Sequence, residues 1–291
     1  MTTALNQVAR ELTDAGASST CAGPPPSPAA VQHCVELARS ILFQPYLDCG
    51  SDHSAAQMTE LLEQLRAALR PQVLLAIGHL QDPDDDADLE ARSTEICDQF
   101  MARLPALRQL LETDVQAAVD GDPALEHPEE AVLCYPGIKA MLCHRIAHAL
   151  HVLGTPLLPR MITSHAHAIT GIDIHPQARI GERFFIDHGT GVVIGATAEV
   201  GAGVRIYQGV TLGAKSFPVD KSGRTVKGLP RHPIVEDDVV IYSGATVLGR
   251  ITIGRGSVIG GNVWVTRDVA PDGRVTQATP VRRQFAHGDG I

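Results

Sequence analysis

Two places in the sequence set an aspartate and a histidine together inside an otherwise aliphatic pattern. Residues 172–176 read IDIHP, and residues 187–191 read DHGTG. A carboxylate bonded to one imidazole nitrogen fixes the tautomer and makes the other nitrogen a better base. The sequence has no GxSxG motif to supply a nucleophilic serine. Asp173 and His188 therefore predict the acid–base half of a catalytic triad without its nucleophile.

A six-residue repeat is expected to position these side chains. Apolar residues recur at a step of six in two series, first Ile174, Ile180, Ile186, Val192, Ala198, Val204 and Val210, then Val235, Ile241, Val247, Ile253, Ile259 and Val265. Neither the period of a helix nor that of an ordinary strand explains this spacing. Repeats this short cannot bury an apolar face alone, so they must stack. The pattern predicts a parallel β-solenoid of about four coils, with three strands in each coil.

The spacing of the two polar residues fits such a solenoid. Asp173 and His188 are 15 residues apart, three short of an 18-residue coil. Stacked coils would therefore bring the two side chains close together at one edge. Residues 215–233 separate the two hexad series, so this segment is expected to loop out of the solenoid.

The first half of the chain has helical periodicity instead. The segments 37–80, 93–122 and 136–154 show helical spacing of apolar residues. Residues 1–36 are rich in Ala, Ser and Thr and contain a proline-rich run at 24–28, which predicts a flexible or loosely docked arm. The sequence thus predicts a mainly helical half followed by a solenoid.

Composition and charge argue against several classes of protein. The 291 residues carry a net charge of −9, which disfavours a general binder of nucleic acid or of anionic membranes. The amino terminus lacks the basic and apolar regions of a secretory signal, and no apolar run has the length of a membrane span, so a cytoplasmic location is expected. Six cysteines without a CxxC pair indicate reduced structural thiols.

The other histidines favour packing over metal binding. A zinc enzyme built on the solenoid needs three spaced histidines, and only His175 and His188 lie there, with His232 at the end of the loop. Three histidines lie on one face of the helix predicted at 136–154, namely His144, His148 and His151. That face has no Asp, Glu or Cys to complete a metal site. No metal is therefore predicted.

The hexads resemble those of the left-handed parallel β-helix acyltransferases. Residues 172–176 and 187–191 resemble, almost residue for residue, the DIHP and DH[AG]TG motifs of bacterial and plant serine O-acetyltransferases. In that family the aspartate of the first motif and the histidine of the second form the catalytic dyad. The likeness runs from about residue 110 to the end of the chain, through the segments 114–117, 122–123, 210–213, 231–233 and 288–291.

The resemblance implies an α+β architecture. An N-terminal α-helical domain would be followed by a C-terminal left-handed parallel β-helix of hexapeptide repeats, as a homotrimer or a dimer of trimers with its active sites between neighbouring solenoids. The expected division is an arm at 1–36, a helical domain at 37–165, a β-helix acetyltransferase domain at 166–280 with its loop at 215–233, and a tail at 281–291.

The resemblance also implies a reaction and its residues. Acetyl would pass from acetyl-CoA to the hydroxyl of L-serine, giving O-acetyl-L-serine for cysteine biosynthesis, with His188 as the general base and Asp173 orienting it. Backbone N–H groups or His232 would stabilise the oxyanion. The residues implied to hold serine are Asp122 and Asp187 for its ammonium, and Arg231 and His232 for its carboxylate.

The acetyl-CoA contacts follow the family pattern less closely. Ala214 stands where a second glycine is usual, and Ala196 where glutamate is frequent. The segment 215–231 carries five basic residues against one acid, a local charge of 5 − 1 = +4, and two readings stay open: a loop that steers or covers coenzyme A, or a solvated surface loop. The residues implied to line the pantetheine arm are Gly213, Ala214, Ser243 and Gly244.

The carboxyl terminus suggests a protein partner. A Gly-containing tail that ends in a branched aliphatic residue packs poorly but suits a pocket that captures a carboxylate. By resemblance, Ile291 enters the active site of O-acetylserine sulfhydrylase, the next enzyme of the pathway, to form the cysteine synthase complex.

Three alternatives stay open at this point. A sugar-modifying acyltransferase shares the hexads, but a neutral sugar needs no counter-charges for an ammonium and a carboxylate, which Asp122, Asp187 and Arg231 supply. Homoserine as the acceptor fits the same charges. A scaffold protein that regulates the sulfhydrylase without catalysis would not need the intact pair of Asp173 and His188.

Overall fold

The computed structural model describes residues 2–14, 23–47, 54–80 and 88–278. The helices are α1 (Thr2–Asp14), α2 (Pro28–Leu42), α3 (Gln44–Leu47), α4 (Ala55–Leu80), α5 (Leu89–Gly121), α6 (Pro128–Cys134), α7 (Pro136–Val152) and α8 (Leu158–Thr170). The strands are β1 (Asp173–Ile174), β2 (Arg179–Ile180), β3 (Phe185–Asp187), β4 (Val193–Ile194), β5 (Glu199–Val200), β6 (Arg205–Tyr207), β7 (Thr211–Gly213), β8 (Ile234–Val235), β9 (Val240–Ile241), β10 (Thr246–Leu248), β11 (Thr252–Ile253), β12 (Val258–Ile259), β13 (Trp264–Val265) and β14 (Arg274–Val275).

The helical half starts earlier and ends later than the sequence predicts. α2 begins at Pro28, where the Ser27 side chain accepts a hydrogen bond from the Ala30 N–H, and Val31 and Val35 are buried in the helical core. The arm predicted for residues 1–36 is therefore wrong over its last nine residues. α8 continues past residue 165 to Thr170, and Gly171 ends it in the left-handed conformation.

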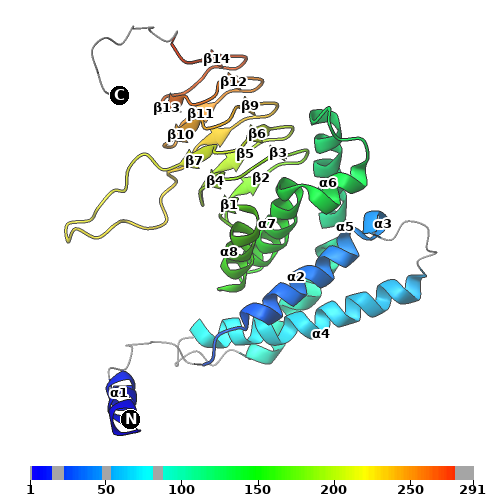
Figure 1. Ribbon diagram of the computed structural model, residues 1–291, viewed down its shortest axis with the longest axis vertical. Coiled ribbons are helices and arrows are strands. Elements are labelled where there is room, and N and C mark those ends of the chain that lie inside the picture. The colour runs from blue at the N-terminus through cyan, green and yellow to red at the C-terminus, as the bar shows by residue number, and fades with distance from the viewer. Residues whose placement is uncertain (1, 15–22, 48–53, 81–87, 279–291) are drawn as a thin grey trace.

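The second half is a left-handed parallel β-helix, as predicted. Its three sheets are all parallel, in the orders β1-β4-β7-β10-β13, β11-β8-β5-β2 and β14-β12-β9-β6-β3. We call these the first, second and third sheets. Two of them have five strands, so the solenoid has about five turns rather than the four expected. Figure 1 shows the coils stacked on the helical half, with the loop after β7 projecting from the stack.

The coil that carries His188 has extra residues at one corner. Asp173 pairs with Val193, which makes this turn 20 residues, whereas Val193 pairs with Thr211, 18 residues on. The chain uses seven residues from Ile186 to Val193 and only five between their partners on the next coil, Ile206 and Thr211. Two extra residues therefore lie at the corner between β3 and β4.

This insertion corrects the repeat predicted from the sequence. Each hexad has two inward positions, one in the strand and one just before it, as Ile194 in β4 and Val192 show. Both rows of inward residues belong to the core of the solenoid. Ile174, Ile180 and Ile186 pair with Ile194, Val200 and Ile206. The residues counted at a step of six therefore belong to one inward row up to Ile186 and to the other inward row from Val192 onward. The step of six stays unbroken there only by coincidence. The 18-residue coil assumed for Asp173 and His188 is wrong for the same reason.

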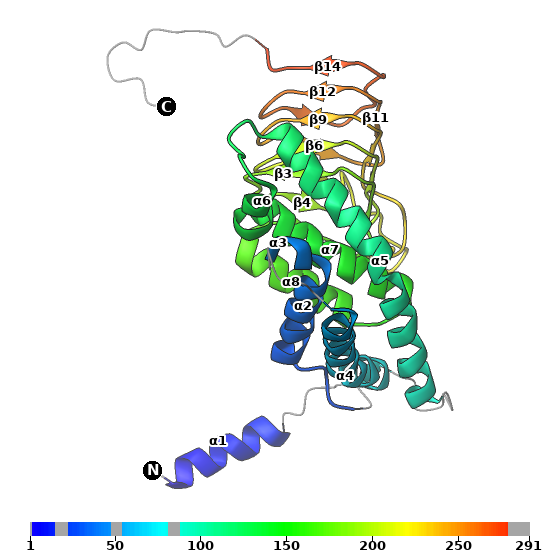
Figure 2. The ribbon, with the colours of Figure 1, turned by 90° about the vertical axis from the view of Figure 1, so that its right-hand side faces the viewer.

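A buried ion pair joins the two halves of the chain. Arg145 on α7 donates to both carboxylate oxygens of Asp114 on α5, at 2.6 and 2.7 Å, and both side chains are buried. Arg145 also donates to the carbonyls of Ile180 and Gly181, and the Phe184 N–H donates to Asp114 at 3.0 Å. These bonds attach α5 and α7 to the first coil. In Figure 2, α5 passes diagonally from the helical half across the lower coils.

Across the described parts of the chain, no helix is both long enough and apolar enough to cross a membrane.

Candidate active site

The predicted base lies on the lengthened corner between β3 and β4. His188 has a φ of 57°, which non-glycine residues adopt at a cost of about 1 kcal/mol and which is concentrated at functional sites. Its side chain is 73% exposed, and its Nε2 lies 3.9 Å from Oδ1 of Asp187, the last residue of β3. The lengthened corner thus carries an imidazole that is exposed to solvent and lies beside a carboxylate.

A second carboxylate reaches this corner from the helical half. Asp122 caps the end of α5, and His188 lies close enough for its charge to contribute to the lowered pKa of the Asp122 carboxyl. The start of α7 packs directly on β3, because a Cβ at Gly137 would lie 2.3 Å from the carbonyl oxygen of Ile186. Only glycine permits this approach. The helices therefore bring Asp122 to the side of the solenoid that carries Asp187 and His188, which we call the His188 corner.

Tyr135 orients Asp122 and was not predicted. Its hydroxyl donates to Oδ2 of Asp122 at 2.6 Å, while the Ala124 N–H donates to Oδ1 at 2.8 Å. These two bonds, that of Tyr135 above all, lower the pKa of Asp122, so the carboxylate stays ionised. Burial, and then the hydrogen bond to Asp122, raise the pKa of Tyr135. Nothing in the sequence pairs a residue before Pro136 with the end of α5, so only the packing shows this contact.

The implied carboxylate ligands lie at a different corner. His232 is buried where the chain passes from the first sheet to the second, at the end of the loop 214–233. Thr197 holds it there, because its backbone N–H donates to Nδ1 of His232 at 3.0 Å. The Arg231 N–H donates to Oγ1 of Thr197 at 2.9 Å, and Nε of Arg231 is buried without a partner among the described residues. We call this group the His232 corner.

Asp173 lies between these corners, as the first residue of β1 in the first sheet, and is half-buried. Among the described residues, no hydrogen bond or ion pair joins it to His188, whose Nε2 lies 3.9 Å from Oδ1 of Asp187. The orienting role of Asp173 therefore stays a prediction.

The residues implied to contact the pantetheine arm divide between the same two corners. Gly213 ends β7, and Ala214 follows it at the His232 corner. Ser243 and Gly244 lie between β9 and β10, in the stack of turns above the His188 corner. Gly244 has a φ of 69°, and a Cβ there would lie 2.2 Å from Oδ1 of Asn262. The stacking of turns accounts for this glycine without a ligand.

Two of the three helical histidines pack as the sequence indicates, whereas His151 is exposed. His144 is buried with a tilted ring contact to His148, and the pKa of His144 is lowered by burial and then by Arg145. His148 shares a 2.8 Å hydrogen bond with the Pro176 carbonyl through Nδ1. Within the part of the chain that the structure describes, no three His, Cys, Asp or Glu side chains are placed to hold a metal ion.

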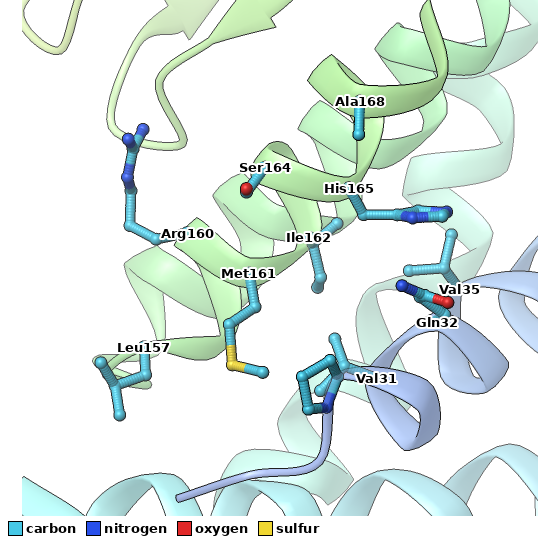
Figure 3. A pocket seen from close by; sticks show the side chains of 11 residues that line it. Val31, Gln32, Val35, Leu157, Arg160, Met161, Ile162, Ser164, His165 and Ala168 are labelled. Carbon is cyan, nitrogen blue, oxygen red and sulfur yellow. The ribbon is translucent and has the colours of Figure 1, made fainter.

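The cleft drawn in Figure 3 is separate from both corners. It lies between α2 and α8, has a volume of about 490 Å³, and is lined by residues such as Val31, Met161 and His165. None of the site residues predicted from the sequence lines it. The polar residues that suit chemistry lie instead at the His188 corner and the His232 corner.

Known proteins match this chain over both halves. Residues 232–267 match the family described as bacterial transferase hexapeptide (six repeats). A plasmid-encoded serine acetyltransferase of Synechococcus elongatus is 56% identical over 205 residues, covering 70% of this chain and 64% of that protein. The serine acetyltransferase of Bacillus subtilis is 44% identical over 191 residues, covering 62% of this chain and 83% of that protein.

Solved structures agree with these relatives. Serine acetyltransferase 1 of Entamoeba histolytica, in complex with L-cysteine, superimposes with a TM-score of 0.75 at 36% identity, covering 84% of this chain and 86% of that one. The Neisseria gonorrhoeae enzyme in complex with serine gives a TM-score of 0.56 at 27% identity, covering 84% and 95%. Sequence identity over most of a relative's length and a shared fold together show that the chain belongs to the serine acetyltransferase family.

Proposed function

We propose that this protein transfers the acetyl group of acetyl-CoA to the hydroxyl of L-serine and so makes O-acetyl-L-serine for cysteine biosynthesis. The observation that carries the proposal is the His188 corner, where an exposed imidazole lies beside the carboxylates of Asp187 and Asp122. Relatives solved with serine or with L-cysteine support an amino acid as the ligand.

The charges suit both ends of an amino acid. Asp122 and Asp187 would hold the ammonium, and the lowered pKa of Asp122 keeps its charge available. Arg231 and His232 would bind the carboxylate. A neutral sugar needs neither pair, so the charges favour serine over the sugar acceptors.

The reaction needs one proton acceptor and no acyl-enzyme. His188 would take the proton of the serine hydroxyl as the oxygen forms a bond to the thioester carbon. The tetrahedral intermediate then collapses, the C–S bond breaks, and the protonated imidazole returns its proton to the thiolate of coenzyme A. Donors fixed near the oxyanion lower the barrier further, and a single such donor is often worth about 10²–10³ in rate.

The loop that leaves the solenoid is a candidate cover for coenzyme A. Val219 and Thr225 form an antiparallel bridge in it, and Asp220 accepts hydrogen bonds from Ser222 and Arg224. Phe217 and Val219 are each 62% exposed, beside the basic residues of the loop. Exposed apolar and cationic groups together suit the pantetheine arm and the phosphates of the co-substrate.

The distribution of the residues supports a trimer with shared active sites. The His188 corner and the His232 corner lie at opposite ends of the strands of the first sheet. Neither corner alone supplies the base, the ammonium ligands and the carboxylate ligands. We propose that the His188 corner of one subunit faces the His232 corner of its neighbour, so that a ring of subunits completes every site.

Mixing two inactive variants tests this arrangement. His188→Ala and Arg231→Ala each disable one corner, and unfolding and refolding them together in equal amounts produces some sites with both corners intact. Random assembly of a ring is expected to restore about a quarter of wild-type activity. Serine-dependent release of coenzyme A is the measurement, and each variant refolded alone is the control. A mixture no more active than the variants alone would contradict a shared site.

The proposed protein partner is O-acetylserine sulfhydrylase. The residue implied to bind it, Ile291, lies outside the described residues. Deleting Ile291 alone is expected to abolish binding to the sulfhydrylase, because the pocket would lose the aliphatic side chain and the terminal carboxylate would move to Gly290, one residue earlier. Binding is measured by calorimetry with the full chain as reference, and acetyl transfer by the shortened chain is the control for folding. Equal affinity of the two chains would refute the partner contact.

A panel of acceptors tests the reaction itself. Release of coenzyme A from acetyl-CoA is followed with L-serine, L-homoserine, glucosamine or no acceptor. Serine is expected to give the fastest release. Faster release with another acceptor would move the assignment to a sibling transferase, and no release from a folded protein that binds the sulfhydrylase would favour the scaffold alternative.

Cytoplasmic location is proposed on the sequence alone.

A further inference from the structure

The hydrogen bonds at the His232 corner determine which ring nitrogen of His232 carries a proton. Oγ1 of Thr197 accepts the N–H of Arg231 at 2.9 Å and the N–H of His232 at 3.1 Å. Both lone pairs of that oxygen are therefore used. Its own hydrogen is left to donate, and Nδ1 of His232 lies 2.8 Å away.

The backbone enforces the same arrangement. The Thr197 N–H donates to Nδ1 of His232 at 3.0 Å, so Nδ1 faces two donors and can only accept. Arg250 fixes both partners from outside, since its Nη1 donates to the carbonyls of Thr197 at 2.7 Å and His232 at 3.2 Å. The ring must then carry its single proton on Nε2.

The opposite edge of the ring covers Gly195. A Cβ added there would lie 2.1 Å from Nε2 of His232, so a glycine is needed for the ring to lie where it does. Among the described residues, Nε2 has no hydrogen-bond partner. Burial, and then the charges of Arg231 and Arg250, lower the pKa of His232 to about 4. His175 also lies within electrostatic reach of this ring, and its own pKa is likewise lowered to about 4, so it adds no charge at physiological pH. The His232 imidazole is thus neutral at physiological pH, with one free donor.

We propose that Thr197 is a positioning residue that holds His232 as a neutral imidazole protonated on Nε2, so that this N–H is presented to an anionic oxygen of the reactants. The proposal rests on acetyl transfer to serine as the function of the site. The anionic oxygen is either the serine carboxylate or the oxyanion of the tetrahedral intermediate. A neutral, rotationally fixed donor suits either oxygen, since it is already oriented when charge arrives.

Two substitutions separate the hydroxyl from the shape of residue 197. Thr197→Val keeps the size and the backbone N–H but removes the hydroxyl, whereas Thr197→Ser keeps the hydroxyl. We expect Thr197→Val to lower kcat/KM for serine about 10- to 100-fold and Thr197→Ser to stay within about threefold of wild type. Thr252→Val, a half-buried threonine on the second sheet, is the matched control. A loss confined to KM identifies the carboxylate as the acceptor, and a loss in kcat identifies the oxyanion.

A spectroscopic measurement tests the proposal without activity. Nitrogen-15 NMR of histidine-labelled intact protein distinguishes a protonated from an unprotonated ring nitrogen, and the His232 signals are assigned by their loss in His232→Gln. We expect unprotonated Nδ1 and protonated Nε2 in the wild type, and a mixture of tautomers in Thr197→Val.

The two measurements keep the proposal and the function apart. Protonated Nδ1 in the wild type would overturn the role of Thr197, as would equal activity losses in the valine and serine variants. Wild-type protein that shows the expected tautomer but releases no coenzyme A with serine would overturn the proposed function and leave the role of Thr197 in setting the tautomer standing.

Discussion

Replacing His188 by alanine is expected to lower kcat for serine acetylation by about 10²- to 10⁴-fold. The side chain is exposed on a corner and packs in no core, so its loss removes the base without removing structure. The serine KM is expected to change little, because Asp122 and its Tyr135 contact do not depend on the imidazole. Serine-dependent release of coenzyme A measures both constants.

An exposed histidine away from the solenoid serves as the control. His167→Ala on α8 removes an imidazole from a helix surface, where alanine is well tolerated, and wild-type kinetics are expected. Equal rates for His188→Ala and the wild type would remove the imidazole from the mechanism and leave only binding at this corner. A parallel loss in His167→Ala would show that the assay reports folding instead.

Replacing Arg145 by methionine is expected to destabilise the protein by about 3–5 kcal/mol. Methionine fills a similar volume but leaves the Asp114 carboxylate buried without its cation, and burial already raises the pKa of that carboxyl. The Ile180 and Gly181 carbonyls also lose their donor. Urea denaturation at a fixed protein concentration measures the change as a lower midpoint.

A surface pair between the same two parts of the molecule is the matched control. Arg183 and Asp120 also join the first coil to α5, at 2.7 Å, but both side chains are almost half exposed. Arg183→Met is expected to cost less than about 1 kcal/mol. Arg145→Met with Asp114→Leu is expected to recover stability relative to Arg145→Met alone, because no buried charge remains. Similar costs for the buried and exposed pairs would contradict the assigned role of burial.

The sequence carries the repeat and the two motifs, but not the contacts between distant turns. The hexads predict the solenoid because each repeat must place an aliphatic residue at the same buried position. They could not reveal the two-residue insertion before Val192, since both neighbouring rows accept the same residue types. The sequence pattern therefore showed that His188 interrupts the aliphatic repeat. It did not show that His188 lies on a corner lengthened by two residues.

The unpredicted residues share one physical origin. Tyr135 meets Asp122 only because α5 ends where α7 begins against β3. Thr197 contacts His232 only because the chain returns to the same corner after the loop 214–233, where β8 pairs with β5. Such contacts depend on docking and register, which no local spacing encodes.

The helices that dock on the first coil also determine where the solenoid can grow. A stack of parallel strands ends in unpaired backbone N–H and C=O groups, which invite another strand. α8 adjoins β1, while α5 and α7 adjoin β3, so the lower edge of the stack is covered by helix instead of lying open to water. The helical half thus does for the solenoid what a terminal capping repeat does in other repeat proteins. A solenoid expressed without its helices would expose the unpaired backbone groups of this edge and would be prone to aggregate.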